Sequence, residues 1–261
     1  MAYVVVCLVA FLVATLTLLS GFGLGTLLLP AFAIFFPVPV AIGATAVVHL
    51  ANNLFKVALV GRRADPGVVL RFALPGALAA LAGAELLSLA AALEPVATYR
   101  LGGQVHEVTV LKLAVAVLMV VFALLELLPR FQRLAFDGRH LVVGGLLSGF
   151  FGGLTGHQGV FRSAFLVKAG LDKEAFVGTG VVSAVIIDVA RLLVYGLTFF
   201  RSSFAGLTPD LGGPVLAATG AAFLGSFLGA RLIAKVTLRS IQLLVGTMML
   251  LIAVGLSAGL V

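Results

Sequence analysis

The sequence predicts an all-α, polytopic membrane protein with two inverted repeats, each a broken re-entrant helical hairpin plus three transmembrane helices. Three observations lead there: an apolar composition, a series of long apolar segments, and glycine-rich interruptions in two of them. We expect a single membrane domain over 1–261, with repeat one at 1–130 and repeat two at 138–261. Its expected place is the inner cell membrane, where it would be multi-pass and surrounded by lipid.

The composition excludes a soluble globule, because 62% of the residues are hydrophobic and only 10% are charged. The mean hydropathy is +1.24. The net charge of +7 comes from Lys and Arg residues that stand mostly in short loops, which indicates membrane topology and not nucleic-acid binding. Cys7 is the only cysteine, so an intramolecular disulfide is impossible. No Lys or Arg precedes Lys56, so the first apolar segment lacks the basic start of a signal peptide, and we expect it to be retained.

Apolar segments follow one another along the whole chain, at 3–36, 38–60, 68–93, 108–128, 141–169, 175–200, 214–236 and 240–260. The first and fifth are too long for one crossing, because about 30 helical residues reach roughly 45 Å against about 30 Å of hydrocarbon. Both contain a glycine-rich interruption, SGFGLGT at 20–26 and SGFFGGLTGHQG at 148–159. Glycine weakens a helix, so each segment is predicted to be two half-helices that meet at a break.

The distribution of basic residues predicts the topology. The positive-inside rule places the loops near 65, 135 and 237 in the cytoplasm and those near 100 and 207 outside. An odd number of crossings must separate 135 from 207, yet two segments lie between them. The broken fifth segment is therefore predicted to be a re-entrant hairpin. Treating the first segment alike leaves three spans in each half, and because three is odd the halves are inverted. The alternative is a duplication with parallel halves and eight simple crossings.

Sequence similarity between the halves supports a repeat. The equivalent positions are Gly25 and Gly159, Ala41 and Ala175, Thr45 and Thr179, and then LAGAEL (81–86) and FLGARL (227–232). Between two spans, the segment 93–111 alternates polar and apolar residues around Gly102 and Gly103, which predicts an external β-hairpin with a structural role.

The segments SGFGLGTLLLP (20–30), HLANNLFK (49–56) and GGLTGHQGVFRSAFL (152–166) resemble the sulfite exporter TauE/SafE family of membrane transporters. The chain departs from the family's glycine triplet, with spaced glycines in the first break and His157 and Gln158 in the second. The resemblance implies a secondary transporter, an exporter of a small sulfur-containing anion such as sulfite or the organosulfonate sulfoacetate, with the site at the midplane between the glycine-broken helices. The alternatives are a passive small-anion channel and a carrier for another small carboxylate or oxyanion.

An enzyme is not expected, since the sequence has no HExxH or GxSxG motif and no paired acids within a span. No cofactor is expected. We expect no metal either, because no acidic residue follows a histidine at i+3 or i+4.

A polar stripe runs along the second segment, where His49, Asn52, Asn53 and Lys56 share one helix face. Polar groups are costly in hydrocarbon, so the stripe is predicted to line an internal, substrate-binding cavity. The alternative is helix-to-helix hydrogen bonding by the asparagines and a Lys56 side chain that reaches the cytoplasmic surface.

The second break supplies two further candidate binding residues. His157 and Gln158 add hydrogen-bonding groups, and protonation of His49 or His157 offers a route for a coupling proton or cation. Oligomerisation is left open.

The breaks themselves are predicted to bind the substrate. Backbone N–H groups at the starts of half-helices 26–36 and 160–169 present two positive dipole ends to an anion. The glycines that allow this are Gly21, Gly23, Gly25, Gly156 and Gly159. Close helix packing is the alternative explanation for them.

Arg162, in the first turn after Gly159, is predicted to be the principal anion-binding side chain, through a bidentate contact. Asp188 and Arg191 lie at i and i+3 and are predicted to form a structural pair, which would leave Arg162 available to the substrate.

Overall fold

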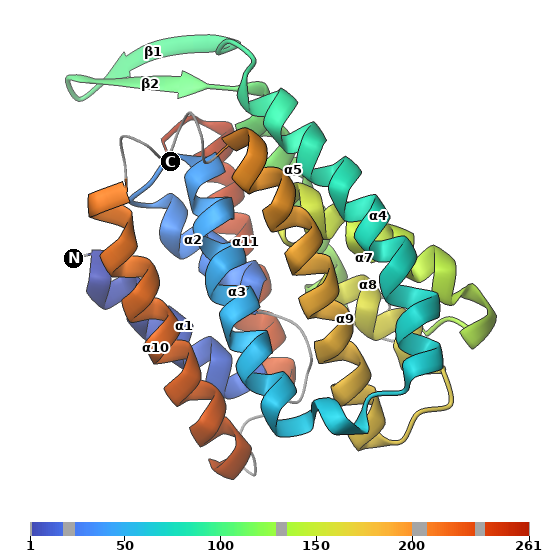
Figure 1. The fold of residues 1–261 in the computed structure, drawn as a ribbon. Helices are drawn as coiled ribbons and strands as arrows, with labels where there is room; N and C mark the ends of the chain where they lie inside the picture. Colours follow the sequence, from blue (N-terminus) through green and yellow to red (C-terminus); the bar gives the residue numbers. More distant parts are fainter. Residues whose placement is uncertain (1, 18–23, 129–134, 200–207, 233–237, 261) are drawn as a thin grey trace.

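The computed structural model describes residues 2–17, 24–128, 135–199, 208–232 and 238–260 (Figure 1). Its helices are α1 (Ala2–Thr17), α2 (Leu24–Ala33), α3 (Val38–Val60), α4 (Pro66–Ala91), α5 (Val110–Leu127), α7 (Leu141–Thr155), α8 (Gly159–Leu166), α9 (Lys173–Val194), α10 (Thr208–Leu232) and α11 (Leu238–Ser257). Short helical turns occupy Gly61–Arg63, Gly138–His140 and Tyr195–Phe199. Two strands, β1 (Ala97–Leu101) and β2 (Gln104–Val108), form the sheet.

Three helices are preceded by a residue whose side chain caps the first turn of the helix. The Asp65 carboxylate accepts a hydrogen bond from the Val68 N–H before α4, and Thr109 and Asp172 do the same before α5 and α9. Such caps satisfy backbone donors that have no partner within the helix. The sequence therefore specifies these starts locally.

Four helical stretches are long and apolar enough to cross a membrane: Val38–Arg63, Pro66–Ala91, Lys173–Leu197 and Leu211–Gly229. Shorter apolar stretches lie in α1, α2, α5 and α11. The surface carries large apolar side chains, such as Leu78, Leu197 and Leu216, each about 70% exposed. Within the described ranges, four charged side chains lie buried in the interior, those of Lys56, Arg162, Asp188 and Arg191. That distribution suits lipid as the surrounding solvent, so the chain is a multi-pass membrane protein.

The fifth apolar segment is broken as predicted. Helix α7 ends at Gly156, whose φ of +86° suits glycine, and α8 begins at Gly159. The 15 residues of α7 reach about 22 Å, less than the hydrocarbon thickness. Helices α1 and α2 likewise divide the first segment, while the break between them lies outside the described residues. Helix α2 covers 24–33 and α8 covers 159–166, so both stop earlier than the predicted half-helices.

Small residues bring the two halves together. The glycines of α7, at positions 145, 149 and 153, lie against the backbone of Phe72, Gly76 and Ala80 in α4, so a Cβ there would overlap that backbone. In the same way Gly225 and Gly229 of α10 lie against the backbone of Phe11 and Thr15 in α1. Both pairs of helices are parallel, because the residue numbers of the contacting positions increase in the same direction along the two helices. Close approach of this kind is typical of membrane helices.

The packing relates the halves to each other. Helix α1 packs on α10 and α7 packs on α4, and α4 and α10 run in opposite directions (Figure 1). Gly83 and Gly229, which the aligned repeats match, contact α7 and α1 respectively. Inverted repeats would produce this pattern, and they remain a prediction.

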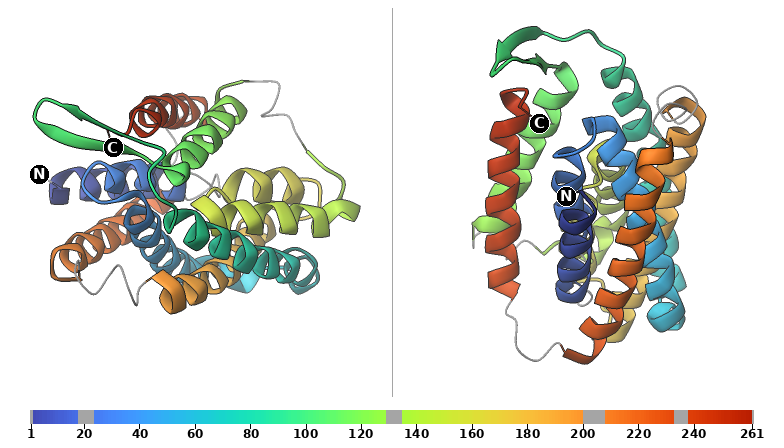
Figure 2. Two further views of the ribbon diagram at one scale, coloured as in Figure 1. Left: turned by 90° about the horizontal axis from the view of Figure 1, so that it is seen from above. Right: turned by 90° about the vertical axis from the view of Figure 1, so that its left-hand side faces the viewer.

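The predicted β-hairpin is confirmed. Strands β1 and β2 pair antiparallel around Gly102 and Gly103, whose φ angles of 60° and 83° require glycine. The Tyr99 hydroxyl donates to the Ala258 carbonyl, and the His106 ring nitrogen Nδ1 lies 3.3 Å from the Gly259 carbonyl oxygen. The hairpin is thereby tied to the end of α11 at one end of the molecule (Figures 1 and 2).

Candidate functional site

The start of α2 meets the second break inside the protein. A Cβ added to Gly25, at the start of α2, would lie 3.3 Å from the Gly156 carbonyl oxygen and 3.5 Å from the His49 ring carbon Cδ2. The start of α2, the second break and the polar stripe of α3 are therefore neighbours. Gly21 and Gly23 lie outside the described residues.

Asp188, in α9, is the centre of the buried polar cluster and is fully buried. Its Oδ2 lies 2.6 Å from His49 Nδ1 and its Oδ1 accepts a hydrogen bond of 2.8 Å from Gln158 Nε2. Arg191 adds a hydrogen bond of 2.9 Å from Nε and an ion pair of 2.7 Å from Nη2, both to Oδ1. Asn53 Nδ2 lies 3.5 Å from Oδ2. One carboxylate thus joins α3, the second break and α9.

Arg162 is connected to this cluster through Gln158. Its side chain is 4% exposed, and Nη1 donates to Gln158 Oε1 over 3.2 Å. The guanidinium also lies close enough to Asp188 and Lys56 to interact with their charges. The predicted pair of Asp188 and Arg191 is confirmed, but Asp188 has further partners outside its own helix. The i, i+3 spacing identified only the partner on the same helix, and three of the groups around Asp188 come from elsewhere.

Lys56 is buried, with 5% of its surface exposed, so its side chain does not reach the protein surface as the alternative proposed. It forms no hydrogen bond or ion pair with any residue that the structure describes. Asn52 is different, because its Oδ1 accepts a hydrogen bond of 2.8 Å from Ser226 in α10. Part of the stripe therefore holds helices together.

Several buried polar atoms have no hydrogen-bond partner among the described residues. They include Thr45 Oγ1, Asn52 Nδ2 and His157 Nε2. A buried polar atom without a partner costs about 1–3 kcal/mol, so proteins rarely leave one without a reason. These atoms offer hydrogen bonds to a polar ligand that enters this region.

His157 has other neighbours than Gln158, the next residue along the chain. Its ring stacks on Phe122 of α5 at 4.7 Å between centroids, and Nδ1 lies 2.9 Å from the Thr155 hydroxyl. Phe151 and Phe161 meet the Phe122 ring edge-on. The neighbouring residues of the GHQG sequence therefore face different surroundings, an aromatic one for His157 and an ionic one for Gln158.

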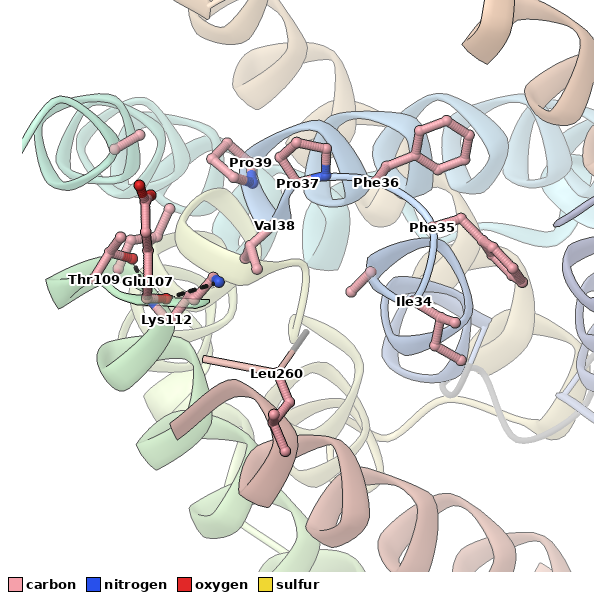
Figure 3. A pocket seen from close by; sticks show the side chains of 13 residues that line it. Ile34, Phe35, Phe36, Pro37, Val38, Pro39, Glu107, Thr109, Lys112 and Leu260 are labelled. Atoms are coloured by element: carbon pink, nitrogen blue, oxygen red, sulfur yellow. Dashed lines mark hydrogen bonds between the residues drawn. The ribbon is translucent and has the colours of Figure 1, made fainter. Parts of the chain in front are cut away.

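A separate pocket of about 410 Å³ lies beside the β-hairpin (Figure 3). Its walls are the end of α2, the start of α5 and Leu260, and Lys112 Nζ donates to the Glu107 carbonyl at its edge. Within the described part of the chain, no group of three His, Cys, Asp or Glu residues could hold a metal ion.

An apolar exterior and a buried cluster of charged groups define an integral membrane protein with a polar interior. The sequence model of the family named Sulfite exporter TauE/SafE matches residues 6–256, and the chain belongs to this family of membrane transporters for sulfite or related anions. Searches of curated proteins and of solved structures gave no match.

Proposed function

We propose that the chain is a secondary transporter that exports sulfite or an organosulfonate such as sulfoacetate across the inner cell membrane. The observation that carries the proposal is the buried cationic cluster formed by α3, α8 and α9. Lys56, Arg162 and Arg191 supply three cations there against one carboxylate, Asp188. Burying cations in this way is costly unless negative charge compensates them, and an anionic substrate supplies it.

The proposed binding residues are those of the stripe and of the breaks: His49, Asn52, Asn53, Lys56, His157, Gln158, Arg162, Gly23, Gly25, Gly156 and Gly159. Asp188 and Arg191 are now added as residues that position them. Asp188 orients Gln158 and His49, and Gln158 in turn holds Arg162. A guanidinium held in this way is oriented for a bidentate contact with a sulfonate or sulfite.

Alternating access would involve movement of one repeat relative to the other around the helix breaks. The contacts between His49 and Asp188 join α3 of repeat one to α9 of repeat two, so such a movement acts on this pair directly. Protonation of His49 would change its bond to the carboxylate, which is a route for coupling transport to a proton.

Counterflow in proteoliposomes tests the proposed function. Vesicles loaded with unlabelled sulfoacetate should take up labelled sulfoacetate transiently above equilibrium, because a carrier exchanges one substrate for the other. A passive channel would show no stimulation by unlabelled substrate on the far side. Absence of any sulfite or sulfoacetate flux would reject the proposal.

A further inference from the structure

The charges of the buried cluster specify the valence of the ligand. Among the described residues, four buried side chains carry a formal charge: Lys56, Arg162, Arg191 and Asp188. With the histidines neutral, three cations and one anion leave an excess of two positive charges. Within the part of the chain that the structure describes, other side chains bonded to Asp188 or Arg162 include His49, Asn53 and Gln158, which are uncharged or histidine.

Lys56 has a different environment from the two arginines. Arg191 pairs with Asp188 directly, and Arg162 interacts with the same carboxylate and bonds to Gln158. Lys56 has no ion pair or hydrogen bond with a described residue, and the charge that acts on it is the positive charge of Arg162. Two neighbouring cations in a low-dielectric interior repel each other, and a bound anion removes that repulsion.

We propose that the site selects dianions over monoanions and that Lys56 is the residue that sets this preference. The inference rests on the proposed function and deepens it. A ligand with two negative charges neutralises the cluster, a monoanion leaves one buried positive charge, and a zwitterion such as taurine leaves both. The favoured substrate class is therefore a small anion with two charges, such as a sulfonate that also carries a carboxylate.

The test compares sulfoacetate with sulfoacetamide, its monoanionic analogue, in which a carboxamide of nearly the same shape replaces the carboxylate. Binding to the purified full chain is measured by calorimetry at neutral pH, and counterflow is measured for both compounds. The wild-type chain should bind sulfoacetate about tenfold or more tightly than sulfoacetamide, as expected for a buried charge interaction. In Lys56→Gln the preference should shrink by about the same factor, chiefly through weaker sulfoacetate binding.

Lys168→Gln is the matched control, because Lys168 is exposed and the substitution removes the same formal charge. It should keep the wild-type preference. Lys56→Met repeats the test with an apolar side chain of similar length, and a thermal melt of each variant reports folding. Equal binding of the two compounds by the wild type, or an unchanged preference in both Lys56 variants, would overturn the inference while leaving the transport function intact. Absence of binding and flux for any small anion would instead reject the proposed function.

Discussion

The carboxylate of Asp188 determines how the neighbouring side chains are oriented. His49 contacts Oδ2 of this carboxylate, and Gln158 and Arg191 donate to Oδ1. One turn beyond Arg191, the Tyr195 hydroxyl donates to the Gly153 carbonyl. Buried polar networks fix one arrangement of side chains when every member is satisfied, and they are costly when a member is removed. The cluster therefore holds the site in a defined geometry.

Replacing Asp188 should reveal this dependence. Asp188→Asn leaves Arg191 as a buried cation without its counter-charge, so we expect a loss of about 3–5 kcal/mol of stability. The double variant Asp188→Asn/Arg191→Met should recover most of it, because both charges are gone, but should not recover sulfoacetate binding. Thermal melts in detergent and calorimetry measure the two effects. If Asp188→Asn alone has the melting temperature of the wild type, the cluster does not stabilise the fold.

Arg162 is the residue for which we expect the largest effect on binding. Arg162→Lys keeps the charge but loses the planar fork, so it should weaken sulfoacetate binding by about tenfold. Arg162→Ala should eliminate binding without unfolding the protein. Arg139→Lys, at a side chain 77% exposed, is the control for the exchange of arginine by lysine. Normal sulfoacetate affinity in Arg162→Ala would place the substrate elsewhere.

Among the structural elements, the glycines serve two distinct purposes. Those of α7 and α10 allow helix backbones to touch, whereas Gly25 and Gly156 lie close to each other, at the start of α2 and the end of α7. A side chain added in the first group would separate the halves. One added in the second would enter the site, since Gly25 faces both the Gly156 carbonyl and His49.

Valine substitutions separate site glycines from other helix glycines. Gly25→Val should abolish transport while membrane insertion persists, because the added methyl groups extend beyond a Cβ position that is already 3.3 Å from a carbonyl oxygen. Gly159→Val should have the same effect if the repeats are equivalent. Gly220→Val is the control, since nothing lies within 4 Å of its Cβ position. Counterflow and membrane-fraction blots report the outcome, and wild-type flux in Gly25→Val would contradict it.

Across the whole molecule, α1 packs on α10 and α7 packs on α4, so each of these pairs joins the N-terminal to the C-terminal half of the chain. The parallel pairs α1 with α10 and α4 with α7 surround the contacts between α3 and α9 at which the buried cluster lies. The buried cluster is thus built from both halves of the chain, with His49 in α3 and Asp188 in α9. If the halves are inverted repeats, as the sequence predicts, this arrangement would support alternating access.

Cysteine labelling tests the inverted topology. Single Ala2→Cys and Val261→Cys variants in a Cys7→Ser background should both react with a membrane-impermeant maleimide added outside intact cells. The expectation follows from one hairpin and three spans in each half, which place both ends on the external side. Labelling of either end only after the membrane is opened would show that the halves are not arranged in this way.

Local chemistry allowed much of the fold to be predicted from sequence. Hydrophobic length predicted the membrane class, glycine content predicted the break at Gly156, and alternation around Gly102 and Gly103 predicted the β-hairpin. Helical spacing also put His49, Asn53 and Lys56 on one buried face. These properties depend on neighbours along the chain, so the sequence by itself determines them.

The partners of that face were decided only by the tertiary structure. His49 and Asp188 are 139 residues apart, and their contact depends on the packing of α3 against α9. Tertiary packing gives Asp188 partners on α3 and at the second break in addition to Arg191. It also buries Lys56, within reach of the charge of Arg162, so that the lysine side chain does not extend to the surface. Periodicity shows which way a side chain faces along its own helix, but the charge that it meets there comes from another helix. Charge balance inside the membrane is therefore a property of the folded molecule.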